Sequence, residues 1–158
     1  MVVRELFASA RREVILAGYS FDHGADILRP LHSVMRDHGV HTLMFVDVPG
    51  KARVPAELED HANRHIRALL IDIWPFGEPR PELYYDPRSA SPSENASLHA
   101  KCLVVDDDAA LITSANFTNR GQTRNIETGV LLRDPAFAAK LAHHWRGLVR
   151  GGWASHYS

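Results

Sequence analysis

Apolar residues along the chain fall either into short continuous runs or into longer stretches with helical spacing. Continuous runs bounded by polar or turn-forming residues are typical of buried strands, and they predict strands at 13–21, 40–48, 70–76, 98–105, 109–115 and 125–134. Stretches in which apolar residues recur every three or four positions predict helices at 25–39, 55–70 and 135–149. Residues 77–97 hold four prolines and several serines, which favours a long loop with at most a short strand around the ELYY segment.

The order of these elements predicts the fold class. Strands and helices alternate over the first part of the chain and a hairpin follows, so we expect an α/β fold with a mixed β-sheet. No internal repeat, linker or low-complexity tract interrupts the pattern. Because 158 residues suffice for a compact unit with a substantial core, we expect a single domain over residues 1–158.

Charge narrows the possible partners. The chain has 18 Lys and Arg residues and 19 Asp and Glu residues, a formal net charge of −1, which argues against a protein that binds nucleic acid with its whole surface. Residues 112–158 nevertheless carry six Lys and Arg side chains against two Asp and Glu side chains. A local basic patch is therefore compatible with the sequence, and it would lie in this part of the chain.

Cysteine content and hydropathy bear on the compartment. Cys102 is the single cysteine, which excludes an intrachain disulfide and fits a reducing cytoplasm. No run approaches the roughly 18 apolar residues of a membrane span, and the N-terminal residues lack a signal-peptide layout. We therefore expect a cytoplasmic protein without stable membrane association. No pair of the ten histidines has zinc-ligand spacing with cysteine or carboxylate support, so no metal and no cofactor is expected.

Residues 98–116, LHAKCLVVDDDAALITSAN, place polar side chains inside apolar runs. The aspartates between the two runs predict a β-hairpin. With Asp107 and Asp108 as a two-residue turn, Lys101 falls opposite Ser114 and His99 falls opposite Asn116. Opposed residues, and residues two apart on one strand, share a face of the sheet. This register gathers the four side chains into one cluster, whereas a shift by one residue would scatter them.

Such a cluster suits phosphodiester chemistry. His99 has the side chain of a nucleophile or general acid near neutral pH. Lys101, Ser114 and Asn116 offer groups that bind non-bridging phosphate oxygens and stabilise the charge that develops on them. Glu127 lies on the next predicted strand, from which its carboxylate could orient the imidazole.

The same segment resembles the phospholipase D superfamily, whose signature is His-x-Lys-(x4)-Asp-(x6)-Gly-Ser-x-Asn. The matching residues are His99, Lys101, Asp106, Ser114 and Asn116, with Thr113 in place of the glycine. The segment NIETGV resembles the family's glutamate strand, and YSFD at 19–22 resembles the first strand of its small bacterial nucleases. LYYDPR, LHAKCLVVDD, TSANFT and RNIETGVLL are similar, more narrowly, to the phospholipase D-like component of the DISARM phage-defence system.

The resemblance implies a sheet with helices on both faces and a metal-independent reaction in two steps. Members of the superfamily use two such motifs around a twofold axis: one histidine attacks phosphorus to form a phosphohistidine, and the other protonates the leaving oxygen. This chain has the His-x-Lys motif once. The simplest source of the second copy is an identical chain, so we expect a homodimer. The implied function is a nuclease acting on DNA, together with other phage-defence components.

Simpler interpretations compete for several residues. Asp106 is expected to support the turn and the strand end structurally rather than take part in chemistry. Arg120 and Arg124 follow the predicted strand at 109–115, and could either contact flanking phosphates or merely be solvated. Two other functions remain open: a phospholipid hydrolase or transferase of the phospholipase D type, and a nucleic-acid-binding subunit that does not cleave.

Overall fold

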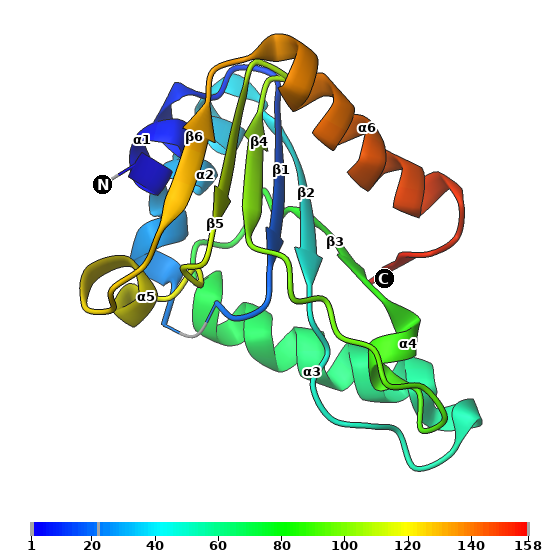
Figure 1. Ribbon diagram of the computed structural model, residues 1–158. Helices are drawn as coiled ribbons and strands as arrows, with labels where there is room; N and C mark the ends of the chain where they lie inside the picture. Colours follow the sequence, from blue (N-terminus) through cyan, green and yellow to red (C-terminus); the bar gives the residue numbers. More distant parts are fainter. Residues whose placement is uncertain (1, 22, 158) are drawn as a thin grey trace.

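The computed structural model describes residues 2–21 and 23–157, and shows a mixed sheet of seven strands in the order β6-β5-β4-β1-β2-β3-β7 (Figure 1). The strands are β1 (Glu13–Gly18), β2 (His41–Val46), β3 (Glu82–Tyr85), β4 (Cys102–Val105), β5 (Ala109–Thr113), β6 (Gly129–Leu132) and β7 (Ser155–His156). β1, β2 and β3 are parallel, whereas the remaining pairings are antiparallel. The expected α/β class with a mixed sheet is confirmed.

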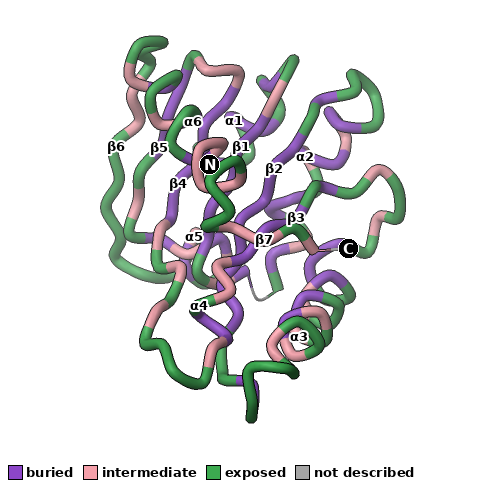
Figure 2. The backbone as a smooth tube through the Cα atoms, turned by 90° about the vertical axis from the view of Figure 1, so that its right-hand side faces the viewer, coloured by how far each residue is buried: buried purple, intermediate pink, exposed green. Residues whose placement is uncertain are grey.

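Helices cover both faces of the sheet. α1 (Val2–Ser9), α2 (Ala25–His38) and α3 (Leu58–Ile73) lie on one face, and α6 (Pro135–Arg150) lies on the other (Figure 1). Side chains of β1 alternate between the two cores, with Val14 and Leu16 facing α1 to α3 and the intervening Ile15 facing α6. Figure 2 shows that the central strands are buried, whereas the edge strand β6 is largely exposed.

Three short elements connect these layers: the 3₁₀ turn η1 (Pro55–Glu57), α4 (Pro87–Ala90) and α5 (Asn119–Thr123). The predicted loop at 77–97 contains β3 and α4, so its ELYY segment does form a strand. The predicted strands at 13–21, 40–48 and 125–134 are present but shorter, as β1, β2 and β6. The sequence pattern predicts no helix at 2–9, where α1 forms.

The predicted strand at 70–76 is wrong, because α3 continues to Ile73. Ile66, Leu70 and Ile73 are buried at helical spacing, whereas Ile71 is 77% exposed. The continuous apolar run therefore conceals a helix with one buried stripe and one apolar side chain in solvent. Trp74, which follows the helix, is buried and donates its indole N–H to the carbonyl of Gly77 at 3.1 Å.

The hairpin between β4 and β5 forms, but its predicted register is wrong by one residue. Cys102 pairs with Ile112 and Val105 pairs with Ala109. The turn therefore contains three residues, Asp106 to Asp108, rather than two. Asp106 and Asp107 adopt left-handed backbone angles, with φ of 57° and 59°. The predicted oppositions of Lys101 to Ser114 and of His99 to Asn116 do not occur in the ladder.

Asp106 explains why the turn takes this form. Its carboxylate accepts backbone N–H groups from Arg11 at 2.8 Å, Arg12 at 2.7 Å and Glu13 at 2.9 Å. The residue thus ties the hairpin turn to the connection between α1 and β1. It lies at the far end of β4 from His99, and its carboxylate contacts backbone N–H groups there and not the candidate site.

Asp106→Ala is expected to lower the free energy of unfolding by about 2 kcal/mol, because three backbone donors lose their acceptor. Denaturant unfolding monitored by circular dichroism measures this change. Asp108→Ala is the matched control. Asp108 has an exposed side chain and forms a 3.7 Å ion pair with the exposed Arg12, so its removal should change stability by less than about 0.5 kcal/mol. Equal effects of the two variants would contradict the role of Asp106 as a backbone anchor.

The topology brings several chain segments to one edge of the sheet, which we term the site edge. β1, β2 and β3 end there, β4 begins there beside the end of β1, and β5 ends where β6 begins. The site edge is the lower edge of the sheet in Figure 1, with α3 and α5 on either side of the strand ends.

Candidate functional site

His99 and Lys101 form the centre of the candidate site. They lie in the extended segment that leads into β4, where His99 is exposed and Lys101 is 9% exposed. The Lys101 ammonium donates to the carbonyl oxygen of His99 at 2.9 Å, and its Nζ lies 3.2 Å from Nε2 of the imidazole. A cation is thus held directly beside an accessible histidine ring.

Tyr19, which directly follows β1, packs against both residues. Its ring centroid lies 4.7 Å from that of His99 and 5.1 Å from Nζ of Lys101. The aromatic face stabilises the cation and limits where the imidazole can lie. Burial lowers the pKa of Lys101, and the charge of Glu127 opposes this change.

Ser114 directly follows β5, and its backbone N–H still donates to the carbonyl of Thr128, beside β6, at 2.9 Å. Thr113 Oγ1 accepts the backbone N–H of Ala115 at 3.0 Å and donates to the carbonyl of Thr128 at 3.2 Å. Ser114 then donates its hydroxyl to Glu127 at 2.5 Å. The charge of Glu127 acts on Lys101, and this electrostatic interaction relates the Ser114–Glu127 pair to the ammonium despite the changed register.

Thr113 stands where the superfamily signature has glycine, and the opposing strand compensates for its bulk. Thr113 pairs with Gly129, the first residue of β6. A Cβ atom at position 129 would lie 3.1 Å from both Cβ and Oγ1 of Thr113. β5 and β6 therefore approach each other closely at this pair, with the glycine on β6.

Glu127 differs in its contacts from the sequence-based expectation. In the part of the chain that the structure describes, its carboxylate accepts hydrogen bonds from Ser114 and, at 3.0 Å, from the side-chain amide of Asn125. The hydrogen bond from Ser114 and, to a smaller extent, the one from Asn125 lower the pKa of Glu127. The predicted contact that would orient His99 is replaced by one that holds the serine.

Asn116 lies farther along, toward α5. Its backbone carbonyl accepts a hydrogen bond from the side-chain amide of Gln122 at 3.0 Å. Its Oδ1 is buried and has no hydrogen-bond partner among the described residues. The structure thus places Asn116 on the wall of a neighbouring surface hollow, together with Arg120, rather than in contact with His99.

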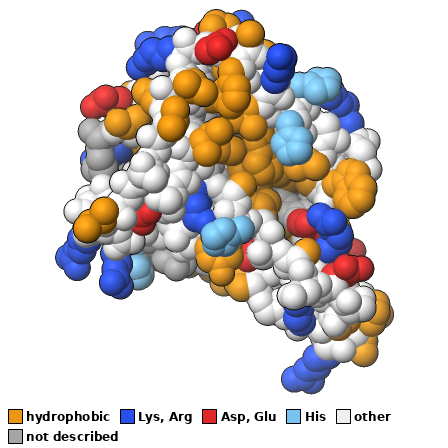
Figure 3. Space-filling model, viewed as in Figure 1, with side chains coloured by type: hydrophobic (Ala, Val, Ile, Leu, Met, Phe, Trp, Pro, Cys, Tyr) orange, Lys and Arg blue, Asp and Glu red, His pale blue; other side chains and the backbone are white. Residues whose placement is uncertain are grey.

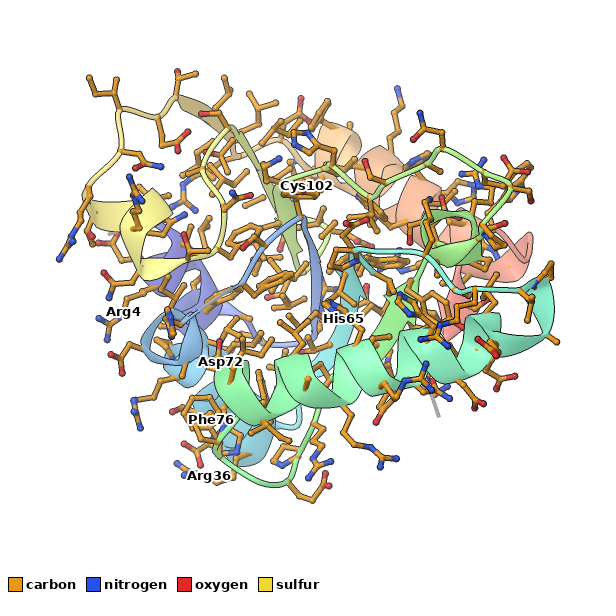
Figure 4. The ribbon with its side chains drawn as sticks, turned by 90° about the horizontal axis from the view of Figure 1, so that it is seen from below. Arg4, Arg36, His65, Asp72, Phe76 and Cys102 are labelled. Atoms are coloured by element: carbon orange, nitrogen blue, oxygen red, sulfur yellow. The ribbon has the colours of Figure 1, made fainter. Side chains whose placement is uncertain are left out.

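Two further residues at the site edge escaped the sequence analysis. Asp47 directly follows β2, is buried, and accepts the backbone N–H of Leu98 at 2.8 Å, which fixes the segment before His99. Burial raises the pKa of Asp47, whereas its backbone hydrogen bonds and the charges of His65 and His99 oppose this change. Figure 4 shows His65 on the side of α3 that faces the strand ends. Asp47 could have been identified from the sequence as a polar residue at the end of a buried strand. No sequence signal identifies His65.

The described residues, 2–21 and 23–157, contain no group of three or more His, Cys, Asp or Glu placed to hold a metal ion. Over the same residues, none of the helices has the length and apolar character needed to cross a bilayer.

A sheet covered on both faces, with a histidine and a lysine side by side where an antiparallel strand meets the end of β1, is a phospholipase D-like arrangement. Residues 3–148 match the family described as cardiolipin synthase, PLD-like domain, and the chain belongs to this family.

The chain is similar to a curated protein in sequence and to solved structures in fold. The DISARM protein DrmC of Bacillus paralicheniformis is 27% identical over 133 residues, which are 83% of this chain and 48% of that protein. The chain therefore spans about half the length of the curated relative it matches. Among solved structures, Nuc from Salmonella typhimurium, a phospholipase D family member, has a TM-score of 0.65 and 21% identity, covering 99% of this chain and 88% of its own.

NucT from Helicobacter pylori is a second similar structure, with a TM-score of 0.68 and 18% identity, covering 99% of this chain and 89% of its own. These structural similarities show the fold, including its helices on both faces. Of the YSFD segment, Tyr19, Ser20 and Phe21 lie at the end of β1, and Asp22 lies outside the described residues.

Proposed function

We propose that this chain is the catalytic part of a metal-independent phosphodiesterase that cleaves DNA through a phosphohistidine at His99. The observation that carries the proposal is the pairing of an exposed imidazole with the ammonium of Lys101 at the site edge. The cation can hold a phosphate oxygen close to the ring, which positions the phosphorus for attack.

The reaction proceeds in two displacements. A ring nitrogen of His99 attacks phosphorus, an N–P bond forms, and the P–O bond to the leaving oxygen breaks. That oxygen takes a proton from a second histidine. The second histidine, now neutral, takes a proton from a water molecule whose oxygen attacks phosphorus and displaces His99. Lys101 and the hydroxyl of Ser114 stabilise the charge on the non-bridging oxygens in both steps, and Glu127 holds that hydroxyl.

The second histidine is proposed to come from another copy of the chain, in a homodimer whose twofold axis passes beside the site edge. The exposed apolar surface near this edge supports the proposal. Ile112 and Val130 pair across β5 and β6 and are 45% and 57% exposed. Figure 3 shows hydrophobic side chains gathered over the strands beside α6. Apolar patches of this kind mark association surfaces.

The similarity to the DISARM protein DrmC supports a substrate and partners connected with phage defence, and hence nucleic acid rather than lipid. The family description, which names cardiolipin synthase, favours the alternative of phospholipid processing. A diacyl phospholipid bound at the site would need an apolar groove beside it to accommodate its two acyl chains.

A substrate panel tests the proposed function. The purified protein, in EDTA, is incubated separately with single-stranded DNA, duplex DNA, RNA and phosphatidylcholine vesicles, and the products are separated. We expect cleavage of DNA to continue in EDTA, because no step passes through a metal. Release of choline without cleavage of DNA would replace the proposal with the phospholipase alternative. DNA binding without any turnover would replace it with the non-cleaving subunit.

A further inference from the structure

A polar hollow of about 700 Å³ lies beside the candidate site, between the segment after β1 and the segment around α5. It is lined by hydroxyl, amide, imidazole and guanidinium groups: Ser20, His23, Asn116, Thr118, Asn119, Arg120, Arg124 and Asn125. The described lining contains no carboxylate. Figure 3 shows Lys and Arg side chains at the lower left of the molecule, where Figure 1 places α5.

We propose that this hollow binds a neighbouring phosphate and nucleotide of a nucleic-acid strand, with Arg120 and Arg124 contacting the phosphate. This inference rests on the proposed function, and it adds a binding subsite beside the phosphate that reacts. The two arginines are exposed, and neither has an ion-pair partner among residues 2–21 and 23–157. By contrast, Arg88 is paired with Asp86 and Arg146 with Asp107.

The spacing of the two arginines adds to this inference. Residues four apart on a helical turn are neighbours, and two like charges at that spacing repel each other. Arg120 lies in α5 and Arg124 directly follows it. A phosphate between the two guanidinium groups relieves the repulsion and accepts charge-assisted hydrogen bonds from both.

The segment that carries the arginines is held together by its own hydrogen bonds. Thr118 accepts the backbone N–H of Gly121 at 2.9 Å, and Gln122 donates to the carbonyl of Asn116. Gly121 lies so close that a Cβ atom there would be 2.6 Å from that carbonyl oxygen. On the other wall, Asn125 donates to Glu127. These contacts hold the segment together, and the hydrogen bond from Asn125 links it to the carboxylate that accepts the Ser114 hydroxyl.

This chemistry favours a polynucleotide over a phospholipid. A nucleic-acid strand carries a phosphate at every nucleotide, so a strand cleaved at His99 presents further anions beside it. A phospholipid of the diacyl type has one phosphate and two apolar chains, for which a hollow lined by amides and arginines offers no match. The side-chain amide of Asn125 and the hydroxyl of Thr118 add polar groups to the hollow, of the kind that hydrogen-bond to sugars and phosphates.

The test measures binding of a fluorescent single-stranded oligodeoxynucleotide by anisotropy, in a His99→Ala background so that no turnover is needed. Arg120→Gln combined with Arg124→Gln should weaken binding at least tenfold at low salt. It should also reduce the slope of log K against log salt by about 0.7, because one phosphate contact on a single strand is lost. Each single variant should give an intermediate affinity.

Arg133→Gln is the matched control, since Arg133 is an exposed arginine just beyond β6, at the end opposite the site edge. It should bind as the parent does. An unchanged affinity and salt slope in the Arg120 and Arg124 double variant would overturn the proposed subsite. Failure of the proposed function would be seen separately, as absence of cleavage by the wild-type protein in the substrate panel.

Discussion

Replacing His99 by alanine is expected to reduce phosphodiester cleavage by about 10⁴-fold or more, because the attacking group is lost. The fold should be preserved. His99 is exposed, and its side-chain contacts are to the ring of Tyr19 and to Lys101, so the free energy of unfolding should change by less than about 0.5 kcal/mol. Initial rates on a labelled oligonucleotide, combined with urea unfolding, measure both quantities.

His38→Ala provides the matched control for this variant. His38 is an exposed histidine at the end of α2, and β2 begins nearby, at the end opposite the site edge. Its replacement should leave the cleavage rate unchanged. Cleavage by a folded His99→Ala protein at more than a tenth of the wild-type rate would show that this imidazole is not the attacking group.

Replacing Lys101 by methionine should have opposite effects on activity and on stability. Cleavage should fall by about 10²- to 10³-fold, because the cation that stabilises the phosphate oxygens is removed. The free energy of unfolding at pH 7 should rise by about 1 kcal/mol, because a charged group that is 9% exposed is replaced by an apolar one of similar length.

The pH dependence of the free energy of unfolding distinguishes removal of the buried charge of Lys101 from simple repacking of the side chain. Because burial lowers the pKa of Lys101 in the folded state, the folded protein binds fewer protons than the unfolded chain between that lowered value and the ordinary lysine pKa. The free energy of unfolding therefore gains a contribution as pH rises through this window, and Lys101→Met should lose it. Lys140→Met, at an exposed position of α6, should retain both the activity and the pH dependence. A Lys101→Met protein less stable than wild type at pH 7 would contradict the cost assigned to the buried charge.

Much of the sheet could be predicted because its central strands are buried on both faces and therefore read as continuous apolar runs, as at 40–48. The apolar run at 70–76 wrongly predicted a strand, because the exposed Ile71 makes the end of a helix appear continuously apolar. Hairpin register could not be derived, because the choice between a two-residue and a three-residue turn depends on Asp106 accepting three N–H groups from a distant segment.

The candidate site was predictable where its residues are close in sequence. His99 and Lys101, two apart in an extended segment, do lie together. Ser114 is related to this pair through Glu127, which accepts its hydroxyl, rather than through the register expected from the turn. Tyr19, Asp47 and His65 come from two other strand ends and a helix, and their convergence depends on the strand order β4-β1-β2. Spacing along the chain carries no information about that order.

The stereochemical course at phosphorus tests most directly whether a protein side chain, rather than water, attacks the substrate. A phosphorothioate oligonucleotide of defined configuration is cleaved in water enriched in ¹⁸O, and the configuration of the product is determined. Two displacements, the first by His99 and the second by water, predict overall retention. Inversion of configuration would mean a single attack by water, and would contradict a covalent intermediate on His99.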